Sequence, residues 1–389
     1  MNSSFTLSAE HEDFRAVVAD FAARDLAPHV ERWNAAAQAP VEAIKLMADL
    51  GLFGLGGPEE YGGAGDFTSL CIAIEEVGRV DQSLGITLEA AVGLGINPLV
   101  HYGTPEQKQR WLPDLVAGHA LAAFGLTEAE AGSDAGATRT RAELRDGQWV
   151  INGSKQFITN SGTDLTSLCT VTARTGTRED GKPEISAICI PAGTPGLEVG
   201  PAYAKLGWHA SDTHPLTFTD VSVPEDHLLG ERGHGYAQFL AILDDGRVAI
   251  AALALGCIRA CRDLAVAYAG QRTSFGGPIG RKQGVAFPIA DLDVMAAAAH
   301  QLVYAAAAMR DAGAEPGAFN RAAAIAKLYA TESAVTATRI ATQVFGGYGF
   351  MEEYPIARFY RDAKVLEIGE GTSEVQRMLI ARRLGLPVE

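Results

Sequence analysis

Several features that define common protein classes are missing from this sequence of 389 residues. Its five cysteines, an odd number without a Cys-x-x-Cys pair, fit buried thiols better than a disulfide framework. Its nine histidines lack the spacing of metal ligands, so no metal site is expected. The N-terminus has no basic flank followed by an apolar run, and its early acidic residues argue against a transit peptide. A cytoplasmic location is therefore expected.

Positive charge is also scarce. Thirty-two basic residues stand against 47 acidic ones, and the net charge of −15 would repel the phosphates of nucleic acids and of anionic lipids. The longest uncharged stretches, 90–105 and 294–309, are interrupted by polar residues, glycine or proline, which disfavours a membrane span. We therefore expect neither nucleic-acid binding nor membrane insertion.

Familiar motifs of phosphate loops and hydrolases are absent. No Gly-x-Gly-x-x-Gly occurs, and the stretch 176–182 ends in Gly-Lys but continues with Pro183, where a phosphate loop needs Ser or Thr. Gly371-Thr-Ser373 lacks the second glycine of a nucleophile elbow. Neither a P-loop enzyme nor a serine hydrolase is indicated.

The pattern of residues changes twice along the chain. Apolar residues recur at helical spacing through the first third, after a candidate N-cap at Ser8. From about residue 121, short β-prone pieces alternate with turn signals, and after residue 235 helical segments rich in alanine follow at about 236–270, 284–312, 318–345 and 372–384. We predict an α+β, mostly α protein with a helical N-terminal domain (1–120), a middle β domain of barrel or sandwich type (121–234) and a C-terminal four-helix bundle (235–389).

Three segments are candidates for function. Gly125-Leu-Thr-Glu-Ala-Glu-Ala-Gly-Ser-Asp134 combines hydroxyl groups with small residues, which let a loop approach a flat polar heterocycle closely. Gln343-Val-Phe-Gly-Gly-Tyr-Gly349 is a glycine-rich stretch, and Glu367-Ile-Gly-Glu-Gly-Thr-Ser-Glu374 places a carboxylate just before a candidate N-cap. Taken singly, they could be an ordinary turn, a helix end and an exposed glutamate.

In this order and spacing the three segments resemble the signatures of the acyl-CoA dehydrogenase flavoprotein family, and the resemblance extends along essentially the whole chain. It implies α,β-dehydrogenation of a saturated acyl-CoA to a trans-2-enoyl-CoA, in which Glu370 removes the α proton while the β hydrogen leaves as hydride to N5 of FAD. A carboxylate beside an apolar substrate chain would be desolvated and more basic, as this step requires. The resemblance also implies a homotetramer and an electron-transfer flavoprotein as electron acceptor.

The resemblance assigns further residues by their match to family stretches. Those expected to bind FAD are Phe124, Leu126, Thr127, Gly132, Ser133, Phe157, Thr159, Arg272, Phe275, Gln283, Gln343, Gly346, Gly347, Thr372 and Glu374. Those expected to bind acyl-CoA are Ser133, Asp244, Arg247 and Gly371. The segment with Arg272, Phe275 and Gln283 is expected to reach the FAD of a neighbouring subunit, with Arg272 supplying charge to the pyrophosphate. Read without the resemblance, Asp244 and Arg247 would be exposed charges on a helix.

Two departures from the family pattern bear on the substrate and the base. Gly369 stands where an aromatic residue is usual, which removes bulk from the acyl pocket and favours a branched or wide acyl group. Some branched-chain and long-chain members carry the base on the helix of Arg247, but Gly246 precedes Arg247 here and leaves Glu370 as the base in register.

Other functions remain open at this stage. A flavin oxidase or monooxygenase of the same fold would use O₂. A catalytically silent acyl-CoA or flavin-binding protein is the non-enzymatic alternative, and a purely structural helical protein is a more distant one.

Overall fold

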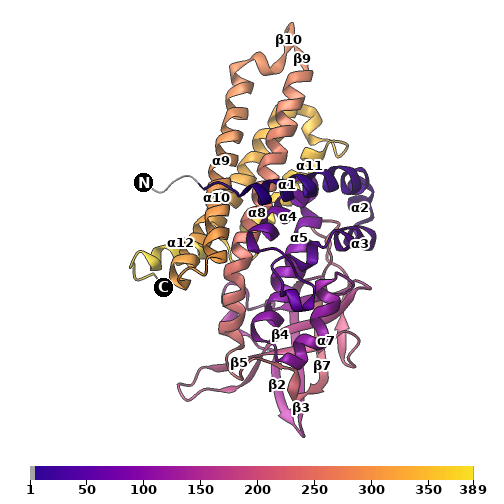
Figure 1. Cartoon of the computed structure of the whole chain (residues 1–389), viewed down its shortest axis with the longest axis vertical. Helices are drawn as coiled ribbons and strands as arrows, with labels where there is room; N and C mark the ends of the chain where they lie inside the picture. Colours follow the sequence, from indigo (N-terminus) through magenta and orange to yellow (C-terminus); the bar gives the residue numbers. More distant parts are fainter. Residues whose placement is uncertain (1–4, 389) are drawn as a thin grey trace.

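The computed structural model describes residues 5–388, and its long axis runs from a β domain at one end to a group of long helices at the other (Figure 1). The N-terminal part is helical and lies between these two ends. Its α-helices are α1 (Ala9–Phe21), α2 (Val30–Ala36), α3 (Val41–Asp49), α4 (Phe67–Val80), α5 (Gln82–Glu89), α6 (Asn97–Tyr102) and α7 (Pro105–Val116). Ser8 caps α1 as predicted, because its hydroxyl accepts a hydrogen bond from the backbone N–H of His11 at 3.2 Å.

The middle part is a mixed sheet with its own apolar core. Its strands are β1 (Leu121–Gly125), β2 (Arg141–Arg145), β3 (Gln148–Thr159), β4 (Thr166–Thr177), β5 (Pro183–Pro191), β6 (Leu197–Val199), β7 (Thr213–Pro224) and β8 (Leu228–Leu229). The strand order is β6-β7-β3-β2-β4-β5-β8, and β1 pairs with β4 in parallel. Trp149, Val171, Ile188 and Phe218 belong to this buried core. The chain therefore turns from helix to sheet at about residue 121, where the sequence pattern changes.

The C-terminal part is built on α8 (Gly235–Gln271), α9 (Gln283–Asp311) and α10 (Pro316–Phe345). At 1.5 Å per residue, the 37 residues of α8 span about 55 Å, from the β domain to the hairpin of β9 (Thr273–Ser274) and β10 (Gly277–Pro278) at the far end (Figure 1). The shorter helices α11 (Pro355–Ala363) and α12 (Ser373–Arg383) follow, and α12 packs on α10. The predicted helices therefore exist, although the last one is much shorter than the other three.

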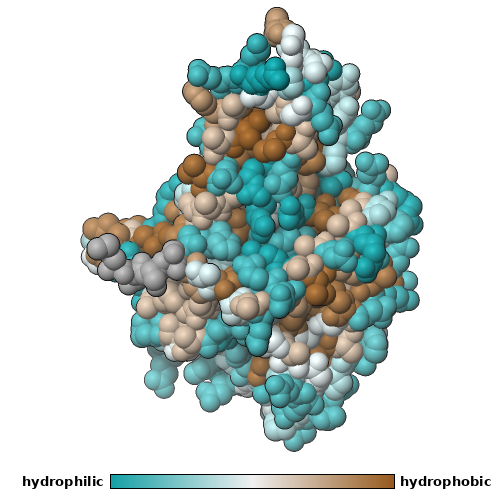
Figure 2. Space-filling view, turned by 45° about the horizontal axis from the view of Figure 1, so that its top comes forward, coloured by the Kyte–Doolittle hydropathy of each residue, from teal (hydrophilic) through white to brown (hydrophobic). Residues whose placement is uncertain are grey.

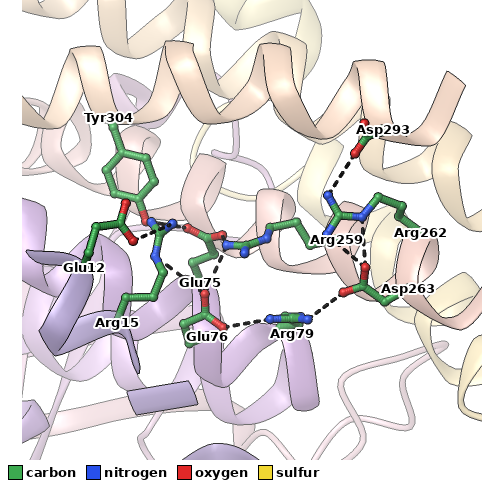
Figure 3. A network of polar contacts seen from close by, with 10 residues as sticks. All are labelled: Glu12, Arg15, Glu75, Glu76, Arg79, Arg259, Arg262, Asp263, Asp293 and Tyr304. Carbon is green, nitrogen blue, oxygen red and sulfur yellow. Dashed lines mark hydrogen bonds and ion pairs between the residues drawn. The ribbon is translucent and has the colours of Figure 1, made fainter. Parts of the chain in front are cut away.

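A buried network of charges fixes α8 to the N-terminal helices (Figure 3). Glu75 on α4 is fully buried and forms ion pairs with Arg259 on α8 and, at 3.4 Å, with Arg15 on α1. Burial alone would raise the pKa of Glu75, but the two arginines outweigh it and hold that pKa below its ordinary value. Arg79 and Asp263 add a second link between α4 and α8 at 2.6 Å. This network holds the helix that carries Gly246 and Arg247 in a fixed position.

Two helical stretches, 82–102 and 283–311, are long and apolar enough to cross a membrane by length and composition alone. The first is mostly buried inside the protein, whereas α9 exposes apolar side chains, including Phe287 and Val294. Figure 2 shows brown, hydrophobic patches between hydrophilic ones on one face of the molecule. Exposed apolar patches of this kind are typical of surfaces that contact another molecule.

Candidate active site

The backbone around Glu370 is held in an unusual conformation. Glu370 has a φ of 52° and Gly371 a φ of 91°, so two successive residues lie in the left-handed region between the turn at 364–367 and α12. Lys327 on α10 donates a hydrogen bond from Nζ to the carbonyl oxygen of Gly371 at 2.8 Å, and Gln376 donates to the same oxygen at 2.9 Å. Thr372 caps α12 by accepting from the N–H of Val375. These contacts fix the segment that directly follows Glu370.

The carboxyl group of Glu370 points into the protein and rests against α8. Both of its oxygens are shielded from solvent and have no hydrogen-bond partner among the described residues. A Cβ added to Gly246 would overlap Oε2 of Glu370, so only glycine at position 246 leaves room for this carboxyl group. The interpretation of Glu370 as an exposed glutamate before a helix is therefore wrong.

A second carboxyl group, that of Glu89 at the end of α5, faces Glu370. Both oxygens of Glu89 are also buried without a hydrogen-bond partner among the described residues. Burial raises the pKa of Glu370 to about 7, although protonated Glu89 and the nearby cations of Lys327 and Arg247 oppose this rise. Burial and the neighbouring Glu370 raise the pKa of Glu89 well above its ordinary value. The pKa values of both carboxyl groups are thus raised, and that of Glu370 lies near neutral pH, as a general base requires.

Sequence reasoning missed Glu89. Its signal was present, because Glu89 is the one Asp, Glu, Lys or Arg between Asp81 and Glu106 in the sequence. A lone charge in such an apolar stretch is rarely buried without a partner. The partner, however, lies near the other end of the chain.

Asp244 and Arg247 form an ion pair one helical turn apart on α8. The amide of Asn320 donates to Asp244 at 2.8 Å, and Arg383 donates to Asn320 at 3.2 Å. The side chain of Arg247 is only 6% exposed and lies near Glu370. The simple interpretation of Arg247 as an exposed charge is therefore wrong, and its predicted contact with acyl-CoA stays a prediction.

A buried ion pair between Lys155 and Glu128 anchors the loop of the segment 125–134. Lys155 is fully buried, and its ammonium donates to Glu128 at 2.8 Å and to the carbonyl oxygen of Leu126 at 3.1 Å. Burial would raise the pKa of Glu128, but Lys155 and hydrogen bonds from Thr138 and from the backbone of Arg139 lower it to about 2. The loop is thus held in place although its outer residues are exposed.

Three of the predicted cofactor residues of the middle domain, Gly132, Ser133 and Phe157, border open space. Gly132 and Ser133 are exposed, and a Cβ at Gly132 would meet nothing within 4 Å. Phe157 has a φ of 62° and is 63% exposed, with its ring 5.2 Å from that of Tyr203. The other members are more enclosed: Phe124 stacks on Phe239 at 3.9 Å, Leu126 is buried, and Thr127 and Thr159 are half-buried. Glu374 is exposed on the first turn of α12.

The remaining predicted cofactor residues lie at the far end of the long helices. Phe275 forms the tip of the β9–β10 hairpin and is 93% exposed, and Arg272 lies over the ring of Tyr348 at 5.5 Å. Gln283 begins α9, Gln343 lies in the last turn of α10, and Gly346 and Gly347 directly follow that helix. Along α8, the 25 residues from Gly246 to Gln271 place this end about 37 Å from Glu370. One chain therefore does not bring all the predicted cofactor residues together.

Comparisons with known proteins agree with this architecture. Three family descriptions match in order: acyl-CoA dehydrogenase N-terminal domain at 8–119, middle domain at 123–221 and C-terminal domain at 233–385. The probable acyl-CoA dehydrogenase YngJ of Bacillus subtilis is 46% identical over 98% of this chain and 99% of its own length. The chain belongs to the acyl-CoA dehydrogenase family. The predicted enzyme class, an oxidoreductase of CH–CH groups, is thereby confirmed.

Solved structures give the same result for the fold of this acyl-CoA dehydrogenase. Butyryl-CoA dehydrogenase from Megasphaera elsdenii superimposes with a TM-score of 0.93 at 40% identity, covering 98% of this chain and 100% of that one. A chain from a structure described as the electron transferring flavoprotein of Acidaminococcus fermentans has a TM-score of 0.93 at 39% identity, covering 98% and 99%. The predicted fold class is confirmed, and these flavoprotein relatives imply a flavin cofactor.

Proposed function

We propose that this acyl-CoA dehydrogenase oxidises a short-chain acyl-CoA to the trans-2-enoyl-CoA, with Glu370 as the base that removes the α proton. The observation that carries the proposal is the carboxyl group of Glu370, which is buried against Gly246 and has a pKa raised to about 7. A base with a pKa near the working pH combines the correct protonation state with sufficient proton affinity. The butyryl-CoA relative supports a short acyl chain.

FAD is the proposed cofactor, and the residues of the middle domain fit a flat heterocycle. The exposed ring of Phe157 offers an aromatic face, and the open space beside Gly132 and Ser133 leaves room for a ligand against a loop that Lys155 holds in place. Thr127 and Thr159 would supply hydroxyl groups on either side. FAD supplies the hydride acceptor for the β hydrogen when it is bound.

The chain itself would orient the thioester and hold the proton. The backbone N–H of Glu370, fixed by the contacts of Lys327 and Gln376 with Gly371, is the proposed donor to the thioester carbonyl, where negative charge develops as the α proton leaves. The Glu370 carboxylate would take that proton in a site closed to water. Asp244 and Arg247 would bind the substrate beyond the thioester.

The predicted FAD residues at the β9–β10 hairpin, Arg272 and Phe275, lie far from Glu370. Their position supports a proposed homotetramer in which each FAD contacts two subunits. Phe275 and Arg272 are exposed at the end of α8, about 37 Å along that helix from Gly246, against which Glu370 lies. An electron-transfer flavoprotein is the proposed electron acceptor, and the Acidaminococcus relative supports this choice. A cytoplasmic location stays a prediction.

The direct test is anaerobic titration of the FAD-loaded protein with butyryl-CoA, isovaleryl-CoA and octanoyl-CoA. We expect butyryl-CoA to bleach the oxidised-flavin absorbance, Glu370→Gln to abolish the bleaching, and the control Glu367→Gln, in the same segment but paired with Lys364, to retain it. Isovaleryl-CoA tests the wide pocket, since a Cβ at Gly369 would meet only the Val365 carbonyl oxygen, at 3.6 Å. Bleaching that survives in Glu370→Gln would refute the assignment of the base.

The same experiment separates the alternative functions. Rapid turnover with O₂ and no other acceptor would favour a flavin oxidase. Flavin that no thioester bleaches would favour a catalytically silent binding protein.

A further inference from the structure

Three arginines surround a hollow of about 420 Å³ on the middle domain, outside the site described above. It is lined by Ala137, Thr138, Arg139, Arg141, Arg174 and Pro183. Arg139 forms an ion pair with the exposed Glu130, whereas Arg141 and Arg174 pair with no carboxylate among the described residues. The hollow therefore keeps a local excess of positive charge in a chain whose net charge is −15. A hollow lined by one sign of charge raises the local concentration of ligands of the opposite sign.

Two of these arginines lie directly opposite each other in the sheet. Arg141 on β2 and Arg174 on β4 are cross-strand partners, and like charges in that arrangement destabilise a sheet. Arg174 is held in place by hydrogen bonds to the carbonyl oxygen of Gly176 at 3.2 Å and to the hydroxyl of Thr177 at 2.9 Å, and among the described residues neither Arg141 nor Arg174 pairs with a carboxylate. An anion bound in the hollow would relieve this repulsion.

The hollow adjoins the segments that are proposed to hold the substrate. The loop that carries Ser133 leads directly into Ala137 and Arg139. Beside them, a Cβ at Gly136 would lie 3.5 Å from the ring of Tyr236, in the first turn of α8. Asp244 follows Tyr236 by eight residues, or about 12 Å along the same helix.

We propose that Arg139, Arg141 and Arg174 bind the phosphates of the CoA nucleotide, the end of the substrate farthest from the thioester. This inference rests on the proposed acyl-CoA substrate. The nucleotide carries a pyrophosphate and a 3′-phosphomonoester, and arginine binds phosphate oxygens through paired N–H donors. If these contacts stabilise the ground state and the transition state equally, they lower KM and leave kcat unchanged.

The test compares two thioesters that differ only in the nucleotide. Butyryl-CoA and S-butyryl-pantetheine are assayed with FAD-loaded wild type, Arg141→Glu and the milder Arg141→Gln. We expect Arg141→Glu to raise KM for butyryl-CoA about tenfold or more, with kcat and the KM for S-butyryl-pantetheine unchanged to within about twofold. Arg145→Glu is the matched control, since Arg145 is an exposed arginine on the same strand that lies outside the hollow and pairs with Glu143.

Binding of adenosine 3′,5′-bisphosphate, measured by calorimetry, separates this inference from the proposed function. If wild type oxidises neither thioester but binds the bisphosphate, and Arg141→Glu weakens that binding, the proposed function fails while the nucleotide site stands. If Arg141→Glu leaves KM for butyryl-CoA unchanged, raises both KM values equally or loses its flavin, the nucleotide site is overturned while dehydrogenation stands. Arg141→Gln should show a smaller effect in the same direction, and a rise in KM with the Arg145→Glu control alone would also overturn the assignment.

Discussion

The carboxyl group of Glu370 lies against Gly246, where an added Cβ would overlap it. A glutamate at position 370 in this conformation therefore requires glycine at position 246. Glu370 reaches this place from the C-terminal segment, and Gly246 lies on α8, one residue before Arg247. The family resemblance indicated that the base can come from either element. Because the side chains at positions 246 and 370 would overlap, a chain can carry the catalytic base at only one of the two positions.

Substitution of Gly246 by alanine should displace the base. The added methyl group would overlap Oε2 of Glu370 and push its carboxyl group out of line, and a misplacement of about 1 Å can lower kcat about 100-fold. We expect Gly246→Ala to retain FAD and to lose most of its activity with butyryl-CoA in steady-state assays. The double variant Gly246→Glu, Glu370→Gly should regain part of that activity, because it moves the carboxylate to α8. Full activity in Gly246→Ala would contradict the close contact.

The pair of Glu89 and Glu370 should determine how activity depends on pH. Glu370 must be ionised to accept a proton, and its pKa is raised to about 7, so kcat/KM should rise with pH up to about 7 and level off above it. Protonated Glu89 lowers the pKa of Glu370. We therefore expect Glu89→Leu to move the rise to higher pH and Glu89→Gln, which keeps a neutral polar side chain facing Glu370, to leave it nearly unchanged. Identical pH profiles for wild type and Glu89→Leu would show that the two carboxyl groups do not interact.

Local sequence patterns predicted the elements of the fold, whereas the family resemblance, and not the local pattern, assigned Glu370 as the base. Such patterns predict contacts between residues that are close in the chain, such as the cap formed by Ser8 and His11, and long helices such as α8. They could not predict contacts made in space between distant segments. The pairing of Glu89 with Glu370 depends on how α5 and the C-terminal segment both pack against α8, and the hollow between β2 and β4 depends on sheet register.

Removal of the Glu370 carboxylate should stabilise the protein at neutral and alkaline pH. A pKa raised from 4.5 to about 7 means that the folded state binds a proton which the unfolded state has already lost, so stability falls as pH rises from 4.5 to 7 and stays low above that. The difference corresponds to roughly 3 kcal/mol at most. Glu370→Gln should therefore have a higher Tm than wild type near pH 8, and the gap should close towards about pH 5. The control Glu367→Gln should show no such gain, and an equal gain at both pH values would point to a cause other than ionisation.

The hairpin at the end of α8 should affect FAD binding although it is distant from Glu370. Arg272 and Phe275 are exposed about 37 Å along α8 from the candidate base, and a hydrophobic ring that is 93% exposed at a loop tip is costly unless another molecule covers it. If a neighbouring subunit brings this hairpin to the flavin, Arg272→Ala should weaken FAD retention about tenfold by loss of a charge-assisted hydrogen bond to the pyrophosphate. Flavin content after dialysis measures retention, light scattering measures the oligomeric state, and Lys45→Ala, which removes an exposed cation from α3, serves as the control. A monomer in solution, or an Arg272→Ala variant that retains FAD as well as wild type, would contradict a flavin shared between subunits.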